Sequence, residues 1–227
     1  MEKYISNINE LNLGNKIAGG SCSDIFEFGQ GKYFKRFLSD YQDLTDPINI
    51  EFYEVIKYLS ELKGMPLIIR GEDIFRSKDK LFGYSMPIIN AQELIKLSND
   101  VLVDDILEGF RLLEPDVRTL ADNFVKTEDV GGGNILFNGK MYLLDLDLSL
   151  VDKRYIPDEL YHRTINSLLC SIRQKLLDDA RFDDVVSPEK SNEYSQRLKE
   201  ICSTALNQEV KTISEMKHGY QKVKSLY

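Results

Sequence analysis

The sequence lacks the features that mark several common protein classes. Its three cysteines are an odd number without a C-x-x-C pair, which argues against both a disulfide framework and a cysteine-based zinc site. No run approaches the roughly 18 consecutive apolar residues of a membrane-spanning helix. The first residues also lack the basic region and apolar run of a secretory signal. We therefore expect a cytoplasmic protein that does not contact membranes.

The balance of charge is negative rather than positive. The formal net charge is −8, from 29 Lys and Arg against 37 Asp and Glu. Because nucleic-acid binding relies on clustered Lys and Arg that neutralise phosphates, this balance argues against nucleic acid as the main partner. The 227 residues, 42% of them hydrophobic, suffice for a substantial core in one domain or two small lobes. No sequence pattern indicates an oligomeric state.

The first part of the chain is rich in strand signals. Residues 16–28 and 32–38 contain aromatic and β-branched side chains and are separated by Gly-Gln-Gly, which predicts a hairpin. Residues 66–70 and 80–89 are two further apolar runs, and Pro87 suits the end of the second strand. A sheet is therefore expected in this part of the chain.

One helix is expected within this strand-rich part, over residues 46–62. Asp46 is a suitable N-cap and Pro47 suits the first helical position. The predicted apolar face consists of residues at roughly helical spacing: Ile50, Tyr53, Ile56 and Tyr58.

The pattern after residue 88 is mainly helical. Residues 91–97 and 101–124 have helical periodicity, with an interruption expected near Glu114-Pro115. Helices are also expected from about residue 158 onward, with a break over 185–188. The predicted organisation is therefore α+β, with a β-rich lobe over residues 1–87 and a helical lobe over residues 88–227.

A second hairpin is expected inside the helical lobe. Residues 134–137 and 140–146 are short apolar runs around Asn138-Gly139, which is the strongest short hairpin signal. The hairpin lies in the stretch TEDVGGGNILFNGKMYLLDLD, whose three glycines are expected to let the chain turn sharply.

Carboxylates and an amide flank this hairpin. Because the hairpin folds the chain back, Asp145 is expected to return close to Asn134. An amide oxygen and a carboxylate together suit Mg²⁺ bound alongside substrate phosphates. Asp129 lies beside them and could deprotonate a hydroxyl group. The alternative is a polar loop whose aspartates cap turns.

The first hairpin has a composition that suits phosphate binding. Small residues at Ala18, Gly20 and Ser23 would let backbone N–H groups approach a phosphate closely. Lys35 follows on the next strand, and Glu51 or Glu54 of the helix could pair with it. Taken singly, each is equally compatible with a flexible turn, a solvated lysine and solvated glutamates.

Together these motifs resemble the protein-kinase-like superfamily, which includes protein kinases and the aminoglycoside and choline kinases. The glycine-rich hairpin, the strand lysine, the helix glutamate, a hinge-like YSMPII and a D-x-x-x-x-N–hairpin–D-x-D segment occur in the order of that superfamily. The resemblance covers roughly residues 14–150. It implies a bilobal fold, with an antiparallel-sheet N-terminal lobe that has one helix and a reduced, mostly helical C-terminal lobe.

The resemblance implies a nucleotide site in the first lobe. Gly19, Gly20 and Ser21 would cover the phosphates of ATP. The adenine edge would meet backbone groups of Met86 and Ile88.

It also implies the groups that carry out the chemistry. Lys35 would hold the α- and β-phosphates and pair with Glu51. Asp129 would be the catalytic base, while Asn134 and Asp145 would bind Mg²⁺.

The chain also departs from protein kinases. Thr127-Glu128-Asp129 stands where those kinases have His-Arg-Asp, and Gly131 replaces a lysine that contacts the γ-phosphate. Asp147 occupies the third position of Asp-Phe-Gly, as in the small-molecule kinases. No Ala-Pro-Glu and no long activation segment follow. These departures favour a minimal or atypical member of the superfamily.

The resulting expectation is an Mg-ATP-dependent phosphotransferase that moves the γ-phosphoryl group to a hydroxyl of a small molecule or a protein. The alternative is a nucleotide-binding pseudokinase or scaffold that regulates a partner without catalysis. Acidic residues could attract a cationic acceptor, although a solvated helix face explains them better. These acidic residues are Asp104, Asp105, Glu108 and Glu114.

Overall fold

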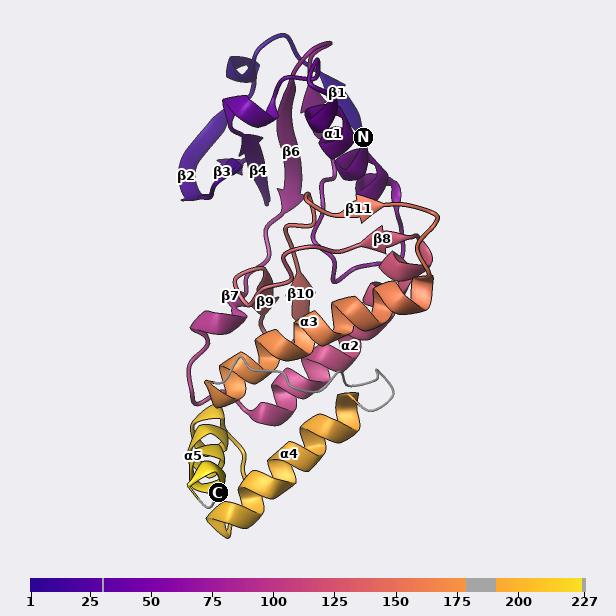
Figure 1. Ribbon diagram of the computed structural model, residues 1–227. Helices are drawn as coiled ribbons and strands as arrows, with labels where there is room; N and C mark the ends of the chain where they lie inside the picture. Colours follow the sequence, from indigo (N-terminus) through magenta and orange to yellow (C-terminus); the bar gives the residue numbers. More distant parts are fainter. Residues whose placement is uncertain (30, 179–190, 226–227) are drawn as a thin grey trace. The chain divides into compact units, whose positions relative to one another are not determined.

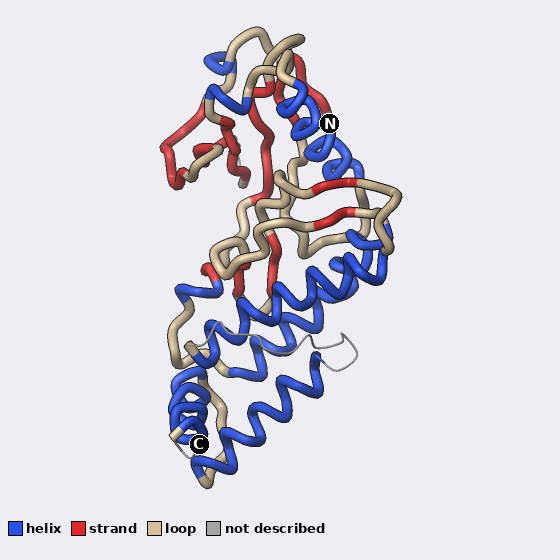
Figure 2. Tube along the Cα trace, in the orientation of Figure 1, coloured by secondary structure: helices blue, strands red, loops and turns tan. Residues whose placement is uncertain are grey.

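A computed structural model describes residues 1–29, 31–178 and 191–225 of the chain. The described residues have an α+β structure with five α-helices and three β-sheets (Figures 1 and 2). None of these helices combines the length and apolar character that crossing a membrane requires.

The chain divides into two compact units. Unit 1 comprises Met1–Gly64, Ile69–Asn90 and Asp145–Ser149, and unit 2 comprises Met65–Ile68, Ala91–Leu144 and Leu150–Tyr227. The sequence predicts a single boundary near residue 87, and two short segments do not follow it. Met65–Ile68 precedes this boundary but belongs to unit 2, and Asp145–Ser149 follows it but belongs to unit 1. The second of these segments contains both aspartates of the D-x-D motif.

Unit 1 is built on a six-stranded sheet with the spatial order β1-β5-β6-β4-β3-β2. Its strands are β1 Glu2–Tyr4, β2 Leu13–Gly19, β3 Ser23–Phe28, β4 Lys32–Phe37, β5 Ile74–Arg76 and β6 Leu81–Pro87. The sheet is antiparallel as expected except at one edge, where β1 pairs with β5 in parallel and makes the sheet mixed. The predicted hairpin is confirmed between β3 and β4, and Gly29 and Gly31 of its turn both have positive φ. Its predicted first arm, residues 16–28, is not one strand, because the chain turns at residues 20–22 between β2 and β3. Two short 3-10 helices also belong to this unit, η1 Ile8–Glu10 and η2 Ser39–Tyr41.

Helix α1, Pro47–Glu61, packs against one face of this sheet. Asp46 caps it by accepting a hydrogen bond from the Ile48 N–H at 2.8 Å, as the sequence predicts. Tyr53 and Ile56 are buried in the cluster that this face forms with the strands, whereas Ile50 is 42% exposed. The predicted apolar face was therefore only partly right. The cluster comprises Phe37, Tyr53, Ile56, Ile74, Leu81 and Tyr84.

A second apolar cluster contains three phenylalanines of the sheet, Phe34, Phe75 and Phe82. The rings of Phe34 and Phe75 meet edge to face with centroids 5.4 Å apart. Phe34 and Lys35 are neighbours on β4, so their side chains leave opposite faces of the strand. Lys35 therefore lies on the α1 side of the sheet.

Unit 2 is mainly helical, with α2 and α3 running side by side (Figure 1). Its helices are α2 Val103–Asp122, α3 Pro157–Leu177, α4 Ser191–Leu206 and α5 Ile213–Lys224, with the 3-10 helix η3 Leu94–Lys96. Its strands are β7 Gln92–Glu93, β8 Val125–Lys126, β9 Ile135–Phe137, β10 Met141–Leu143 and β11 Leu150–Val151. The predicted break over residues 185–188 lies outside the described residues.

Several local predictions in unit 2 can be compared with the structure. The hairpin at Asn138-Gly139 is confirmed, because β9 and β10 pair in register around it. The helix predicted over 91–97 is wrong, since β7 pairs with β9 and only the single turn of η3 follows. The strand predicted over 66–70 is also wrong, because within it only Ile68 forms an isolated bridge, to Leu143.

Helix α2 continues through Pro115 without the expected interruption. A proline inside a helix removes one hydrogen bond and costs about 3 kcal/mol. Burial of a long apolar stripe offsets this cost, because side chains on both sides of the proline are almost fully buried. These side chains include Ile106, Phe110, Leu113, Val117 and Leu120.

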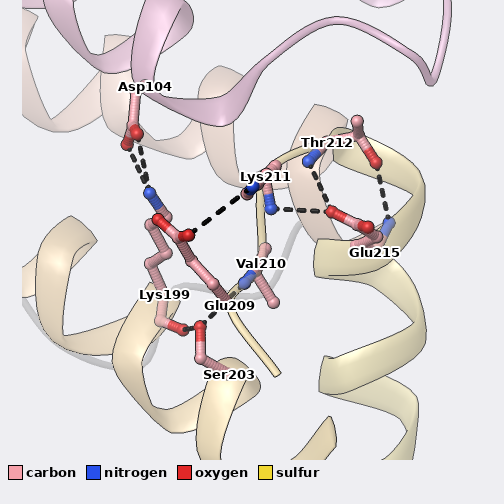
Figure 3. Close-up of polar contacts among 8 residues, drawn as sticks. All are labelled: Asp104, Lys199, Ser203, Glu209, Val210, Lys211, Thr212 and Glu215. Atoms are coloured by element: carbon pink, nitrogen blue, oxygen red, sulfur yellow. Dashed lines mark hydrogen bonds and ion pairs between the residues drawn. The ribbon is translucent and has the colours of Figure 1, made fainter.

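The start of α5 is fixed by a capping box (Figure 3). Glu215 Oε2 accepts hydrogen bonds from the N–H groups of Lys211 and Thr212 at 2.7 and 3.0 Å, and the Thr212 hydroxyl accepts from the Glu215 N–H at 3.3 Å. Lys199 of α4 forms an ion pair with Asp104 of α2 at 2.7 Å. The start of α5 is joined to the start of α2, because the Val103 N–H donates to the Lys211 carbonyl oxygen at 2.8 Å and the Ile213 N–H donates to the Val101 carbonyl oxygen at 3.1 Å.

Candidate functional site

Lys35 is positioned by the pairing of two central strands of unit 1. It lies opposite Tyr84 in the register of β4 and β6. The next residue along that register, Gly83, has φ +152°, and a Cβ there would lie 1.9 Å from the carbonyl oxygen of Lys35. Only glycine lets the two strands approach this closely. The Lys35 residue is 5% exposed as a result of this packing and of its partners.

Both carboxylates of the D-x-D motif contact Lys35 within unit 1. Lys35 Nζ donates a hydrogen bond to Asp145 Oδ1 and lies 2.7 Å from Asp147 Oδ2. The Tyr84 hydroxyl donates to the other oxygen of Asp147 at 2.9 Å. The Asp145 side chain is 42% exposed, whereas that of Asp147 is 8% exposed. One carboxylate is therefore open to a ligand and the other is held inside the unit.

The electrostatics of this cluster keep Lys35 charged. Burial disfavours its charged form, but the oxygens of Tyr84, Asp147 and Asp145 outweigh that effect and hold the pKa of Lys35 well above its usual value. Burial raises the pKa of Asp147, Lys35 lowers it and Asp145 raises it further, with a net increase. Burial also raises the pKa of Tyr84, so its phenol stays protonated and can donate to Asp147.

The two oxygens of Asp147 have different partners. Oδ1 accepts from the Tyr84 hydroxyl, and Oδ2 is 2.7 Å from the Lys35 ammonium group, which supplies the opposite charge that a buried carboxylate requires.

The backbone is left-handed at two of the predicted site residues. Five non-glycine residues of the described chain have positive φ, and three of them follow helices, where this conformation commonly ends a helix. Those three are Phe124, Asp178 and Asn207. The other two are Asp129, at φ +52°, and Asp145, at φ +62°. Such outliers away from helix ends cluster at functional sites.

Asp129 lies in a loop of unit 2 that Asn134 organises. The Asn134 amide donates to the carbonyl oxygen of Asp129 at 2.8 Å and to its carboxylate at 3.2 Å. Ser171 of α3 contacts the next residue, because its hydroxyl lies 3.2 Å from the Val130 carbonyl oxygen and can donate either to it or to the Ser167 carbonyl oxygen, also at 3.2 Å. The Asp129 side chain stays exposed and oriented.

The chain turns sharply at the three glycines, as the sequence predicts. The Asn134 N–H donates to the Gly131 carbonyl oxygen at 2.9 Å and closes a turn over Gly132 and Gly133, although none of the three glycines has positive φ. A Cβ at Gly133 would meet nothing within 4 Å, and one at Gly131 would meet only Asp129 Oδ1 at 3.8 Å. The glycines therefore keep side chains away from this surface rather than supply unusual backbone angles.

The predicted ion pair between Lys35 and Glu51 is not formed. Glu51 and the alternative Glu54 are both exposed on α1, and Lys35 pairs with the D-x-D carboxylates instead. Glu51 would face the sheet only if its neighbour Ile50 lay on the buried face of α1, and Ile50 is 42% exposed. In the structure Asn49 occupies that face, and its amide donates to the Asp40 and Asp43 carbonyl oxygens at 2.9 and 3.1 Å.

The residues predicted to meet the nucleotide all belong to unit 1. Gly19, Gly20 and Ser21 are exposed at the turn between β2 and β3, where the Gly20 N–H donates to the Ser23 carbonyl oxygen at 2.8 Å.

The predicted adenine-binding positions lie at the end of β6. Met86 is partly buried against the α1 cluster. The Ile88 N–H donates to the Gly31 carbonyl oxygen at 3.2 Å, so an adenine that uses this N–H must replace that bond.

The predicted magnesium ligands belong to different units, Asn134 to unit 2 and Asp145 to unit 1. Their convergence stays a prediction. Among the described residues no group of three His, Cys, Asp or Glu side chains is arranged to hold a metal ion. The chemistry of unit 1 nevertheless fits Mg²⁺, which binds one or two carboxylates together with substrate phosphates. Asp145 is the accessible carboxylate, whereas Asp147 is buried against Lys35 and Tyr84.

Sequence reasoning did not assign a role to Asp147 or Tyr84. The D-x-D spacing is a usable signal for Asp147, because the first aspartate of the same motif is a predicted metal ligand. Tyr84 had no comparable signal, since a tyrosine in an apolar strand is usually a packing residue. No protein-family model matches this chain, and no curated protein matches it.

Proposed function

We propose that this protein is an Mg-ATP-dependent phosphotransferase with a bilobal protein-kinase-like fold, which moves the γ-phosphoryl group of ATP to a hydroxyl group. The observation that carries the proposal is the contact of Lys35 with both D-x-D carboxylates, which lie far along the chain. A buried ion cluster is an expensive way to stabilise a fold. Perturbed charged groups of this kind cluster at functional sites.

Unit 1 would bind the nucleotide. Lys35 neutralises phosphate charge, and its two aspartates hold its ammonium group in place before the nucleotide binds. Asp145 would hold Mg²⁺, which supplies charge neutralisation on the phosphate oxygens. The glycine turn is exposed, and a Cβ at Gly20 would meet nothing within 4 Å, so a phosphate could approach the backbone there.

Asp129 of unit 2 would accept the proton of the acceptor. The acceptor oxygen forms a bond to the γ-phosphorus as the bond from that phosphorus to the β,γ-bridging oxygen breaks, and ADP leaves. The hydroxyl proton moves to the Asp129 carboxylate, which Asn134 orients, and then to solvent.

A second candidate is a nucleotide-binding scaffold without catalysis. It is favoured by the bonds of the two residues before Asp129. The Thr127 hydroxyl lies 2.6 Å from that of Thr164 inside unit 2, and Glu128 pairs with Lys126 and Arg163 at 2.7 and 3.0 Å. Both side chains serve the fold of unit 2 rather than a substrate.

The proposal is tested by incubating the purified protein with Mg-ATP and measuring ADP and the masses of protein and added acceptors. Asp129→Asn and Asp145→Asn are the informative variants, because asparagine tolerates a left-handed backbone. Asp122→Asn, at the exposed end of α2, is the matched control.

We expect ADP formation by the wild type and the control, and a fall of about 100-fold or more in both site variants. ATP binding without ADP formation would favour the scaffold. Equal ADP formation by the wild type and both site variants would overturn the assigned roles.

A further inference from the structure

A pocket of about 290 Å³ lies within unit 2, beside the loop that carries Asp129. Its size is close to the lower limit of about 300 Å³ for small-molecule sites. Helix α3 and its C-cap, Asp178, contribute four of the seven lining residues, and η3, α5 and the glycine loop contribute one each. The lining residues are Ile95, Gly132, Ser171, Gln174, Lys175, Asp178 and Lys217.

Lys175 is the most unusual residue of this pocket. It is only 9% exposed, and its Nζ donates to the carbonyl oxygens of Leu97 and Ile95. An ammonium group carries three N–H donors, so one donor remains after these two bonds. Among the ion pairs of the described residues, none includes Lys175.

The other charges of the pocket leave it positive. Lys217 of α5 pairs with Asp178 at 2.8 Å, which neutralises both of them. The charge of Lys175 is therefore not balanced by a carboxylate of the lining. A buried ammonium without a counter-ion is costly, and a bound anion would remove that cost. Burial and the charge of Lys217 lower the pKa of Lys175, and Asp178 opposes them.

The pocket is connected to the loop of Asp129 by direct contacts. Ser171 lines the pocket, and its hydroxyl lies 3.2 Å from the Val130 carbonyl oxygen. Gly132 also lines it and is three residues from Asp129, so their Cα atoms are at most about 11 Å apart. A Cβ at Gly132 would lie 3.6 Å from that of Ile95, so a longer side chain here would narrow the pocket.

The acidic residues of α2 do not offer a comparable site for a cation. Asp104 is neutralised by Lys199, and Glu108 by Arg111 at 2.6 Å. Within the pocket lining itself, Lys175 is the charge that no carboxylate pairs with, so the lining favours an anionic ligand.

We propose that this pocket binds the phosphoryl acceptor, and that the acceptor is a small hydroxyl-bearing anion whose carboxylate or phosphate group contacts Lys175. The assignment of this ligand as the phosphoryl acceptor rests on the proposed function. Binding of an anion in the pocket does not depend on that function. The anionic group would take the remaining N–H of Lys175, and the hydroxyl would extend past Gly132 toward Asp129.

Calorimetric titration at constant ionic strength tests the binding. The probes are glycerol 3-phosphate and glycerate, which distinguish a phosphate ester from a carboxylate, with glycerol and ethanolamine as the neutral and cationic comparisons. The variant is Lys175→Gln, which keeps donors for the two carbonyl oxygens and removes the charge. Lys222→Gln, at an exposed position on α5, is the matched control.

We expect at least one anion to bind the wild type and the control, and to bind Lys175→Gln about tenfold or more weakly. Glycerol and ethanolamine should bind more weakly than that anion. Failure of both anions to bind, equal binding by Lys175→Gln, or a preference for ethanolamine would each overturn the proposal. Such a result would leave Lys175 with a structural role as a cap of η3.

A parallel assay with Mg-ATP separates this inference from the proposed function. If anions bind in a Lys175-dependent way but none is phosphorylated, the anion site is supported and the proposed transfer to these acceptors is contradicted. If a neutral or cationic acceptor is phosphorylated independently of Lys175, the phosphotransferase activity is supported and the role of the pocket as an anionic acceptor site is contradicted. Asp129→Asn should retain anion binding in the calorimeter while losing transfer.

Discussion

At the residue scale, Asp147 links the stability of unit 1 to the proposed chemistry. Asp147→Ala removes a buried counter-ion of Lys35 and leaves the Tyr84 hydroxyl without its acceptor. We expect a loss of about 3–5 kcal/mol in the free energy of unfolding, measured with urea. Asp147→Asn, which retains an acceptor for Tyr84, should cost less.

The matched control is Glu72→Ala, which breaks an exposed pair with Lys32 at 2.8 Å. That change should cost about 0–1 kcal/mol. Equal losses for Asp147→Ala and Glu72→Ala would show that the buried cluster does not stabilise the unit.

The left-handed backbone of Asp129 leads to a second prediction at the residue scale. Because φ is +52° there, Asp129→Ala should be less stable than Asp129→Gly by about 1 kcal/mol in thermal or urea unfolding. The opposite order is expected at the exposed helical position Glu108 of α2. There Glu108→Gly should be less stable to unfolding than Glu108→Ala by about 1 kcal/mol. The same order at both positions would contradict the left-handed loop.

Single residues also show where sequence reasoning was limited. Lys35 could be chosen because its strand, its neighbours and the family resemblance agreed. The partner of Lys35 could not be predicted in the same way, because choosing Glu51 requires knowing which residues of α1 face the sheet. The actual partners lie on a segment that is distant in sequence, and no local pattern indicates which of several carboxylates reaches the lysine.

At the element scale, the predictions that held had a local chemical cause. Asp46 and Pro47 define the start of α1, and the Asn138-Gly139 turn defines the β9–β10 hairpin. The predictions that failed depended on tertiary contacts. Pairing with β9 turns Gln92–Glu93 into a strand, and burial of the α2 stripe carries that helix through Pro115.

The capping box of α5 gives an element-scale prediction. Thr212→Ala removes the hydroxyl that accepts from the Glu215 N–H, and should destabilise the protein by about 1 kcal/mol in urea unfolding. Thr204→Ala is the control, because that hydroxyl only donates to the Glu200 carbonyl oxygen inside α4. A larger loss for Thr204→Ala would contradict the role of the cap.

At the scale of the whole molecule, the proposed function requires that both units respond to the nucleotide. We expect Mg-ATP to slow amide hydrogen exchange in the β2–β3 turn of unit 1 and in the 129–134 loop of unit 2. The 3-10 helix η1 and the capping box of α5 should remain unchanged and serve as internal references. Protection confined to unit 1 would favour a nucleotide-binding scaffold over a phosphotransferase.

The most direct test of the central claim is a calorimetric titration of Mg-ATP into the wild type, Lys35→Met, Lys35→Arg and Lys32→Met, after circular dichroism has shown that each is folded. Lys32 is the matched control, since it lies on the same strand but has a side chain that is 39% exposed. The account predicts that the wild type and Lys32→Met bind Mg-ATP, and that both folded Lys35 variants bind it at least about tenfold more weakly. Absence of binding to the wild type, or equal binding by the Lys35 variants, would contradict it.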